Sequence, residues 1–146
     1  MIINFKLDKI IATKQKLPKG NIEASNNVKV IDVEKESVAS LSDQKAVTFK
    51  FMYGVTYKPN IASIELDGNV VYMSDDATVK GILDNWKKNK KIEQGIAAQV
   101  FNAILSRCNI KALKLEEELE LPFHIPVPRV RTKEQTAPET KQAKAS

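Results

Sequence analysis

The feature that most constrains this chain is the strict alternation of residue types between positions 47 and 57. The even positions of this stretch are mostly Thr, Lys, Met and Gly, while the odd ones are all large and apolar: Val47, Phe49, Phe51, Tyr53, Val55 and Tyr57. Successive side chains of a strand point to opposite faces of a sheet, so this pattern predicts one long strand with one apolar face. That face must be covered by another layer of the protein.

A second strand with the same pattern follows the turn at Lys58-Pro59-Asn60. Its apolar positions keep one parity through Asp67-Gly68-Asn69, namely Ile64, Leu66, Val70 and Tyr72. Unbroken parity favours one continuous strand, because a one-residue slip would move every later side chain to the other face. A hairpin at Asp67-Gly68 is the alternative, since Asp-Gly between apolar runs is also a turn signal.

Two weaker strands precede this pair. Ile3, Phe5 and Leu7 alternate with polar residues, and the parity then breaks at Ile10-Ile11, as a bulge or a twist would require. Residues 16–27 contain Pro18, Gly20 and the Ser-Asn-Asn cluster and are predicted to form a loop. A second strand with a similar slip is expected at Val28, Val30, Ile31 and Val33, and residues 37–44 are predicted to be a connection.

From Ser74 the apolar period changes to that of a helix. Asp75 or Asp76 is the expected N-cap, and the buried stripe is Val79, Ile82, Leu83 and Trp86. A second helix is expected from about residue 92 to a C-cap at Asn109, with an apolar stripe that includes Cys108. Residues 111–120 are amphipathic and strongly acidic, and Glu116-Glu117-Glu118 suggests a solvent-exposed face.

The segment Leu121-Pro-Phe-His-Ile-Pro-Val-Pro128, named the strap here, combines three prolines at positions 122, 126 and 128 with large apolar residues. Prolines at this density exclude a helix or a central strand, so the strap should be extended. Sealing of the core is one interpretation, and it predicts that Leu121, Phe123, Ile125 and Val127 are at least partly buried. A detachable ligand for a groove on another protein is the other interpretation.

Together these elements predict an α+β fold, in which a four-stranded antiparallel sheet is followed by two C-terminal helices packed on one face. The length of 146 residues suits a single domain. We expect that domain to span residues 1–131, including the strap. Residues 132–146 are rich in Lys, Gln, Thr and Ala without a large apolar residue, which predicts a disordered basic tail.

Composition narrows the class of protein. The longest apolar runs are too short for a membrane span, and the amino-terminal residues alternate with charges, so we expect no membrane insertion and a cytoplasmic location. A single cysteine excludes an internal disulfide. The net charge of +5 is modest, and residues 129–146 hold five Lys or Arg against two Glu, so much of it lies in the tail.

Residues suited to catalysis or metal binding are scarce. His124 and Cys108 are the single residues of their types, so no Cys/His metal cluster and no histidine triad can form within one chain. Cys108 lies on an apolar stripe and is best explained as a small buried side chain. The glycines form no phosphate-binding or nucleophile motif. We therefore predict no enzyme, no cofactor and no metal.

One compact basic cluster is present at the end of the first helix, at Lys87, Lys88, Lys90 and Lys91 beside Trp86. Lysines can bind phosphates and a tryptophan can stack on a base, although Trp86 also continues the core stripe. Combined with Arg129, Arg131 and Lys133, the cluster supports an alternative function as an RNA-binding or ribosome-associated protein.

The order of these elements, closed by "GIAAQVFNAILSRCNIKALKLEEELELPFHIPVPRV", resembles the SecB family. The "WKKNKK" and "LPFHIPVP" phrases also resemble a group of short archaeal proteins. The SecB resemblance implies a non-enzymatic oligomer that binds unfolded or extended polypeptide. Phe49, Phe51, Tyr53 and Tyr57 are then the candidate polypeptide-binding residues, and Tyr53 or Tyr57 could also contact a second copy. SecB chaperones are acidic, whereas this chain is basic.

Overall fold

The computed structural model describes residues 1–36 and 44–126 and contains one antiparallel sheet and two helices. This architecture confirms the fold class expected from the sequence. The elements are β1 (Ile2–Lys14), β2 (Glu23–Glu36), β3 (Gln44–Lys58), β4 (Ala62–Asp75), α1 (Asp76–Asn89) and α2 (Gln94–Glu118).

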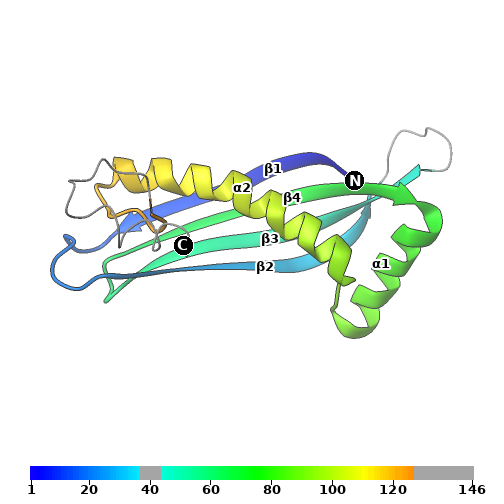
Figure 1. The fold of residues 1–146 in the computed structure, drawn as a ribbon, viewed down its shortest axis with the longest axis horizontal. Coiled ribbons are helices and arrows are strands. Elements are labelled where there is room, and N and C mark those ends of the chain that lie inside the picture. Colours follow the sequence, from blue (N-terminus) through cyan, green and yellow to red (C-terminus); the bar gives the residue numbers. More distant parts are fainter. Residues whose placement is uncertain (37–43, 127–146) are drawn as a thin grey trace, which may run out of the picture.

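The four strands are arranged in the order β1-β4-β3-β2, so the first two strands of the chain form opposite edges of the sheet. Residues 15–22 connect these edges around one end of the molecule (Figure 1). Backbone N–H groups of Gln15 and Lys16 donate to the carbonyl of Ile61 in the β3–β4 turn, which ties the connection to that end. At the other end, the N-terminal amine of Met1 donates to the Met73 carbonyl, 2.7 Å away.

β3 and β4 form the centre of the sheet and match their predicted pattern. Tyr53 pairs with Leu66 and Phe51 with Gly68, so β4 is one continuous strand through Asp67-Gly68-Asn69 and contains no hairpin. The glycine at position 68 has a steric explanation. A Cβ there would collide with the Lys6 carbonyl oxygen of β1 and lie 2.9 Å from the Phe51 ring. The close approach of β1 to β4 therefore requires glycine at this position.

β2 begins earlier than the sequence indicated. Ser25, Asn26 and Asn27 were predicted to lie in a loop, but they pair with Thr56, Val55 and Gly54 of β3. The prediction was wrong because the long neighbouring strand supplies backbone partners that outweigh the low strand propensity of Asn. The slip expected near Ile31 is confirmed as a register shift between Val30 and Asp32. In β1 the register shifts lie between Ile2 and Asn4 and between Leu7 and Lys9, both ahead of Ile10.

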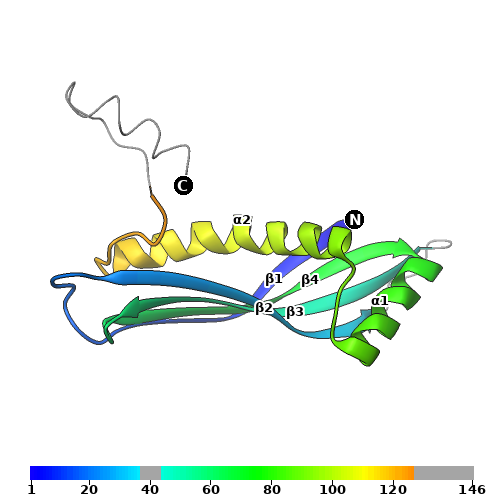
Figure 2. The ribbon, with the colours of Figure 1, turned by 60° about the horizontal axis from the view of Figure 1, so that its bottom comes forward.

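Both helices cover the same face of the sheet. α1 lies across the end of the sheet, and α2 crosses the strands diagonally (Figure 1) as a layer above them (Figure 2). α1 starts at Asp75, one of the two predicted N-caps, whose carboxylate accepts from the Thr78 backbone N–H at 3.2 Å. Its buried residues are Val79, Ile82 and Trp86, which confirms most of the predicted stripe.

α2 is longer than expected and continues to Glu118. Asn109 was predicted to be its C-cap, but this residue lies inside the helix, where its side chain accepts a hydrogen bond from Tyr53. The acidic segment 111–120 is therefore mainly the last part of the same helix. No helix among the described residues is both long enough and apolar enough to cross a membrane.

Candidate functional site

The four aromatic residues predicted to bind polypeptide lie in the core. Phe49, Tyr53, Phe51 and Tyr57 are 0–1% exposed, because the odd positions of β3 face the helices and the helices cover them. In this arrangement their rings present no surface to a polypeptide or to a second copy of the chain. The two tyrosine hydroxyls, however, reach beyond the core to the strap.

The orientation of α2 decides which parts of the sheet stay open. Its fully or nearly fully buried residues recur at every fourth position: Ile96, Val100, Ile104, Cys108, Ala112 and Glu116. A step of four residues rotates the contact line by about 40°, so this line winds around the helix as the helix crosses the twisted sheet. α2 packs against β4, β3 and β1, while α1 packs against β3, β4 and β2.

The two sides of α2 are identified by their contacts. Arg107 lies 5.5 Å from the ring of Phe5 on β1, so its side of the helix faces the β1 edge. Asn109 accepts from Tyr53 on β3, so its side faces β3 and β2. Phe101 and Leu105, which precede Asn109 by eight and four residues, share that second side.

Four apolar residues on β2 and on the second side of α2 are partly exposed. Val28 and Val30 of β2 pair with Tyr53 and Phe51, so their side chains point into the helix layer, but both remain partly exposed. Phe101 and Leu105 are also partly exposed. These four residues are called the shelf, and β2, which carries two of them, is an edge strand with no outer partner within residues 1–36 and 44–126 (Figure 1).

The strap begins where α2 ends and returns over the sheet. Leu121 is 6% exposed, and its N–H donates to the Glu116 carbonyl. Ile125 is partly buried, whereas Phe123 is 41% exposed, so its predicted burial is wrong. Its side chain is exposed because the segment is held through its backbone and through His124. Val127 lies outside the described residues.

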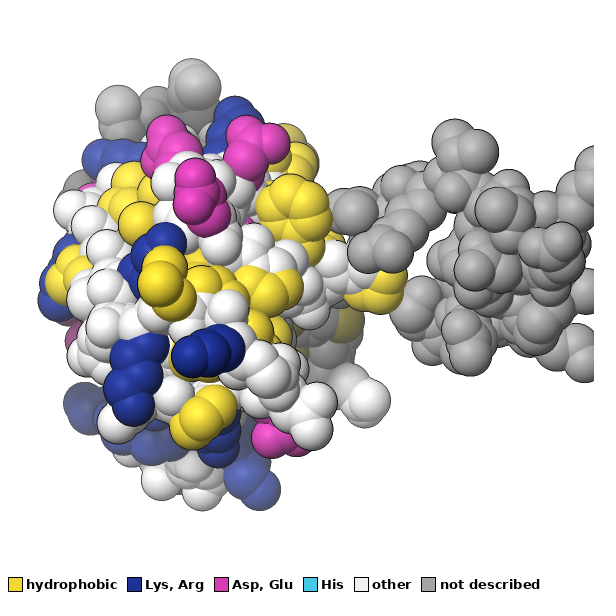
Figure 3. All heavy atoms as spheres, turned by 90° about the vertical axis from the view of Figure 1, so that its left-hand side faces the viewer, with side chains coloured by type: hydrophobic (Ala, Val, Ile, Leu, Met, Phe, Trp, Pro, Cys, Tyr) yellow, Lys and Arg dark blue, Asp and Glu magenta, His cyan; other side chains and the backbone are white. Residues whose placement is uncertain are grey.

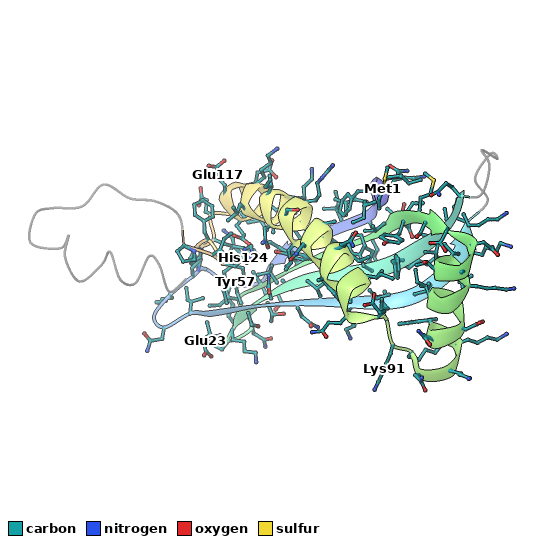
Figure 4. The ribbon with its side chains drawn as sticks, turned by 45° about the vertical axis from the view of Figure 1, so that its right-hand side comes forward. Met1, Glu23, Tyr57, Lys91, Glu117 and His124 are labelled. Carbon is teal, nitrogen blue, oxygen red and sulfur yellow. The ribbon has the colours of Figure 1, made fainter. Side chains whose placement is uncertain are left out.

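A buried polar cluster fixes the strap. The Tyr57 hydroxyl donates to the Pro122 carbonyl, and the His124 N–H donates to one Glu116 carboxylate oxygen at 3.0 Å. The other Glu116 oxygen lies 2.6 Å from Nδ1 of His124, and the two side chains are 0% and 2% exposed. The labelled Tyr57 and His124 lie together beneath the carboxyl end of α2 (Figure 4).

The hydrogen-bond geometry defines the protons of this cluster. Tyr53 has one proton and donates it to Oδ1 of Asn109 at 2.6 Å. Nε2 of His124, which is 3.0 Å from the Tyr53 oxygen and 3.2 Å from Asn109 Oδ1, must then donate rather than accept. Nδ1 of His124 faces the second Glu116 oxygen at 2.6 Å, so a proton on Nδ1 would be donated to that carboxylate.

Burial keeps the tyrosines of the cluster protonated. Removal from water raises the pKa of Tyr53 to about 12, and burial followed by the nearby Glu116 raises the pKa of Tyr57 as well. Both hydroxyls therefore act as neutral donors. Burial also raises the pKa of the Cys108 thiol to about 12, and Cys108 is 0% exposed, which confirms its expected core role.

Glu116 is the member of this cluster that sequence reasoning missed. It was assigned to a solvent-exposed acidic face, and that prediction is wrong because the side chain is fully buried. The burial of Glu116 could have been predicted from the sequence, since this residue continues the four-residue spacing of Ile104, Cys108 and Ala112. The second signal for a buried polar partner was His124, the single histidine, eight residues later.

The basic cluster lies far from the strap. Lys87, Lys88, Lys90 and Lys91 are exposed at the carboxyl end of α1 (Figure 4 labels Lys91). Trp86 is only 9% exposed, so its ring belongs to the core, and Lys90 lies 5.3 Å from its centre. Arg129, Arg131 and Lys133, the other predicted RNA-binding residues, lie outside the described residues.

The end of the molecule that carries the strap also exposes apolar side chains. Figure 3 looks at this end and shows hydrophobic side chains between scattered Lys or Arg and a group of acidic residues. Leu17 of the β1–β2 connection is 75% exposed, and Phe123 of the strap is 41% exposed. Within residues 1–36 and 44–126, no three His, Cys, Asp or Glu side chains are placed to hold a metal ion.

The arrangement of sheet and helices is a SecB-like fold. The chain is similar to the solved structure of the Mycobacterium tuberculosis Rv1957 SecB-like chaperone in complex with a ChAD peptide from the Rv1956 HigA1 antitoxin. The match has a TM-score of 0.53 and 11% identity and covers 90% of this chain and 91% of the other. No family model and no curated protein matches the sequence.

Proposed function

We propose that this protein is a non-enzymatic, chaperone-type protein that binds unfolded or extended polypeptide on the shelf. The observation that carries the proposal is the partly exposed apolar surface of Val28, Val30, Phe101 and Leu105 beside a free sheet edge. An extended segment can pair its backbone with such an edge while alternate side chains rest on the apolar surface.

The fold supports this function. The similar Rv1957 structure is a SecB-like chaperone that holds a peptide. Because fold alone does not define function, the proposal depends on the shelf, which offers apolar contact without a specific polar recognition pattern. Such contact, at about 25 cal/mol per Å² of apolar area buried, suits clients that share exposed apolar residues and little else.

Suppression of aggregation of a chemically unfolded client tests the function. The wild-type protein at stoichiometric concentration should reduce light scattering by the client, and absence of any effect would reject the proposal. The variant Val30→Ser/Phe101→Ser should lose most of the effect. Its matched control is Met52→Ser/Val71→Ser, because these partly exposed apolar residues lie on the sheet face that the helices leave uncovered.

Self-association is the second part of the proposal. β1 is an edge strand whose outer side has no partner among the described residues, and its Ile10 and Ile11 are 47% and 43% exposed. Exposed apolar edge strands promote pairing with another chain. Static light scattering at micromolar concentration should give a mass above the 16.3 kDa of one chain, and a monomer at all concentrations would contradict this part.

A further inference from the structure

The strap continues the shelf towards the end of the sheet. Asn109 lies on the same side of α2 as Phe101 and Leu105, and its Oδ1 is 3.2 Å from Nε2 of His124. The surface beside α2 therefore runs from the shelf directly into the place that the strap occupies. Beneath the strap are the Tyr53 and Tyr57 hydroxyls and the Glu116 carboxylate.

The contacts that hold the strap are those that would hold any extended peptide. Tyr57 donates to a backbone carbonyl, that of Pro122, and Glu116 accepts from a backbone N–H, that of His124. The side-chain contacts come from buried Leu121, from the imidazole three residues later and from partly buried Ile125. Pro122, Phe123 and Pro126 are exposed, so few apolar contacts oppose release of the segment.

We infer that residues 121–125 are a built-in competitor that fills one end of the polypeptide site until a client displaces it. The inference rests on the proposed function and names a class of client. The best client has an extended segment with an aliphatic residue in the place of Leu121 and a proton-bearing side chain, such as His or Lys, three residues later to neutralise Glu116.

Substitutions within the strap test this inference, because they leave Tyr53, Tyr57 and Glu116 intact. The variant Leu121→Ala/His124→Ala should bind an unfolded client at least about tenfold more tightly than wild type, since a weaker competitor raises the fraction of open sites. Phe123→Ala is the matched control, because this exposed side chain belongs to the same segment and should leave the affinity unchanged.

A peptide provides the converse test. A synthetic peptide of residues 119–126 should bind to Leu121→Ala/His124→Ala and compete with the client there, and it should bind much more weakly to wild type. The same peptide with Leu and His replaced by Ala should not compete. Peptide binding of equal strength to both proteins would contradict the inference.

Hydrogen exchange on the wild-type protein avoids any folding defect of the variants. The His124 amide, which donates to Glu116, should be protected in the free protein and should exchange faster when the client is bound. Unchanged protection together with client binding would overturn the inference and leave the proposed function standing. Absence of client binding by every variant would overturn both.

Discussion

Replacement of Gly68 by Ala should destabilise the fold far more than replacement of Gly54, although both glycines lie in the central strands of the sheet. A Cβ at position 68 would lie 2.9 Å from the Phe51 ring and 3.1 Å from the Cα of Leu7, and would collide with the Lys6 carbonyl. Carbon atoms pack at about 3.5–4.0 Å, so the ring must move by at least about 0.5 Å. The Lys6 carbonyl belongs to the backbone, so β1 must move as well.

The magnitude follows from these displacements. Overpacking of a core costs about 1–3 kcal/mol, and each ladder hydrogen bond lost as β1 shifts adds about 1 kcal/mol. Movement of Phe51 also disturbs its stacking on Phe5, whose ring centre is 5.4 Å away. We therefore expect Gly68→Ala to lower the free energy of unfolding by about 3–5 kcal/mol.

Gly54 provides the matched control. A Cβ there would meet only the Ile64 carbonyl oxygen, at an ordinary contact distance of 3.6 Å. Alanine in a strand is favoured over glycine by about 0.5–1 kcal/mol, so Gly54→Ala should be neutral or slightly stabilising. Urea unfolding followed by far-ultraviolet circular dichroism measures both variants. Equal stability of the two would refute the close approach of β1 to β4.

Three further outcomes are expected. Native Cys108 should resist a thiol-reactive dye at pH 8 and react only on unfolding, because burial raises its pKa to about 12; rapid labelling without loss of structure would contradict this burial. The free energy of unfolding should fall as pH rises from 10 towards 12. The unfolded chain loses the Tyr53 proton near its pKa of 10.0, whereas the folded state keeps that proton to about 12. The variant Tyr53→Phe should reduce this loss of stability in a pH series of urea melts. A chain ending at residue 120 should be less stable than one ending at residue 131 by several kcal/mol, since burial of Leu121 alone is worth about 1.5–3 kcal/mol; equal melting temperatures would show that the strap contributes nothing to the core.

The sequence was most informative where one local pattern coincided with burial. Every odd position of β3 from Val47 to Tyr57 carries a large apolar residue, and all of these side chains are buried. β4 keeps the same parity through Asp67-Gly68-Asn69, which decided correctly between a strand and a hairpin. In both strands the two-residue side-chain period places the apolar residues on one face, and the helix layer buries that same face. The local alternation was therefore sufficient to predict the strands.

The sequence was less informative where the partner of a residue lies far along the chain. Asn26 enters β2 because Val55 offers it a pairing position, and Asn109 stays helical because Tyr53 donates to it. Neither partner can be read from neighbouring residues. The polar cluster could not be predicted for the same reason. His124 contacts both Tyr53 and Glu116 only after the sheet and α2 have packed.

The strand order also determines the sequence of events during synthesis. β2, β3 and β4 are joined in order and pair as neighbours, so β3 and β4 can each pair with the preceding strand on leaving the ribosome. β1 is made first, yet its partner β4 ends at Asp75, and the amine of Met1 bonds to Met73. β1 therefore stays without its strand partner until β4, Ala62–Asp75, has emerged. During that interval its isoleucines, Ile2, Ile3, Ile10 and Ile11, lack the neighbouring strand that flanks them in the fold.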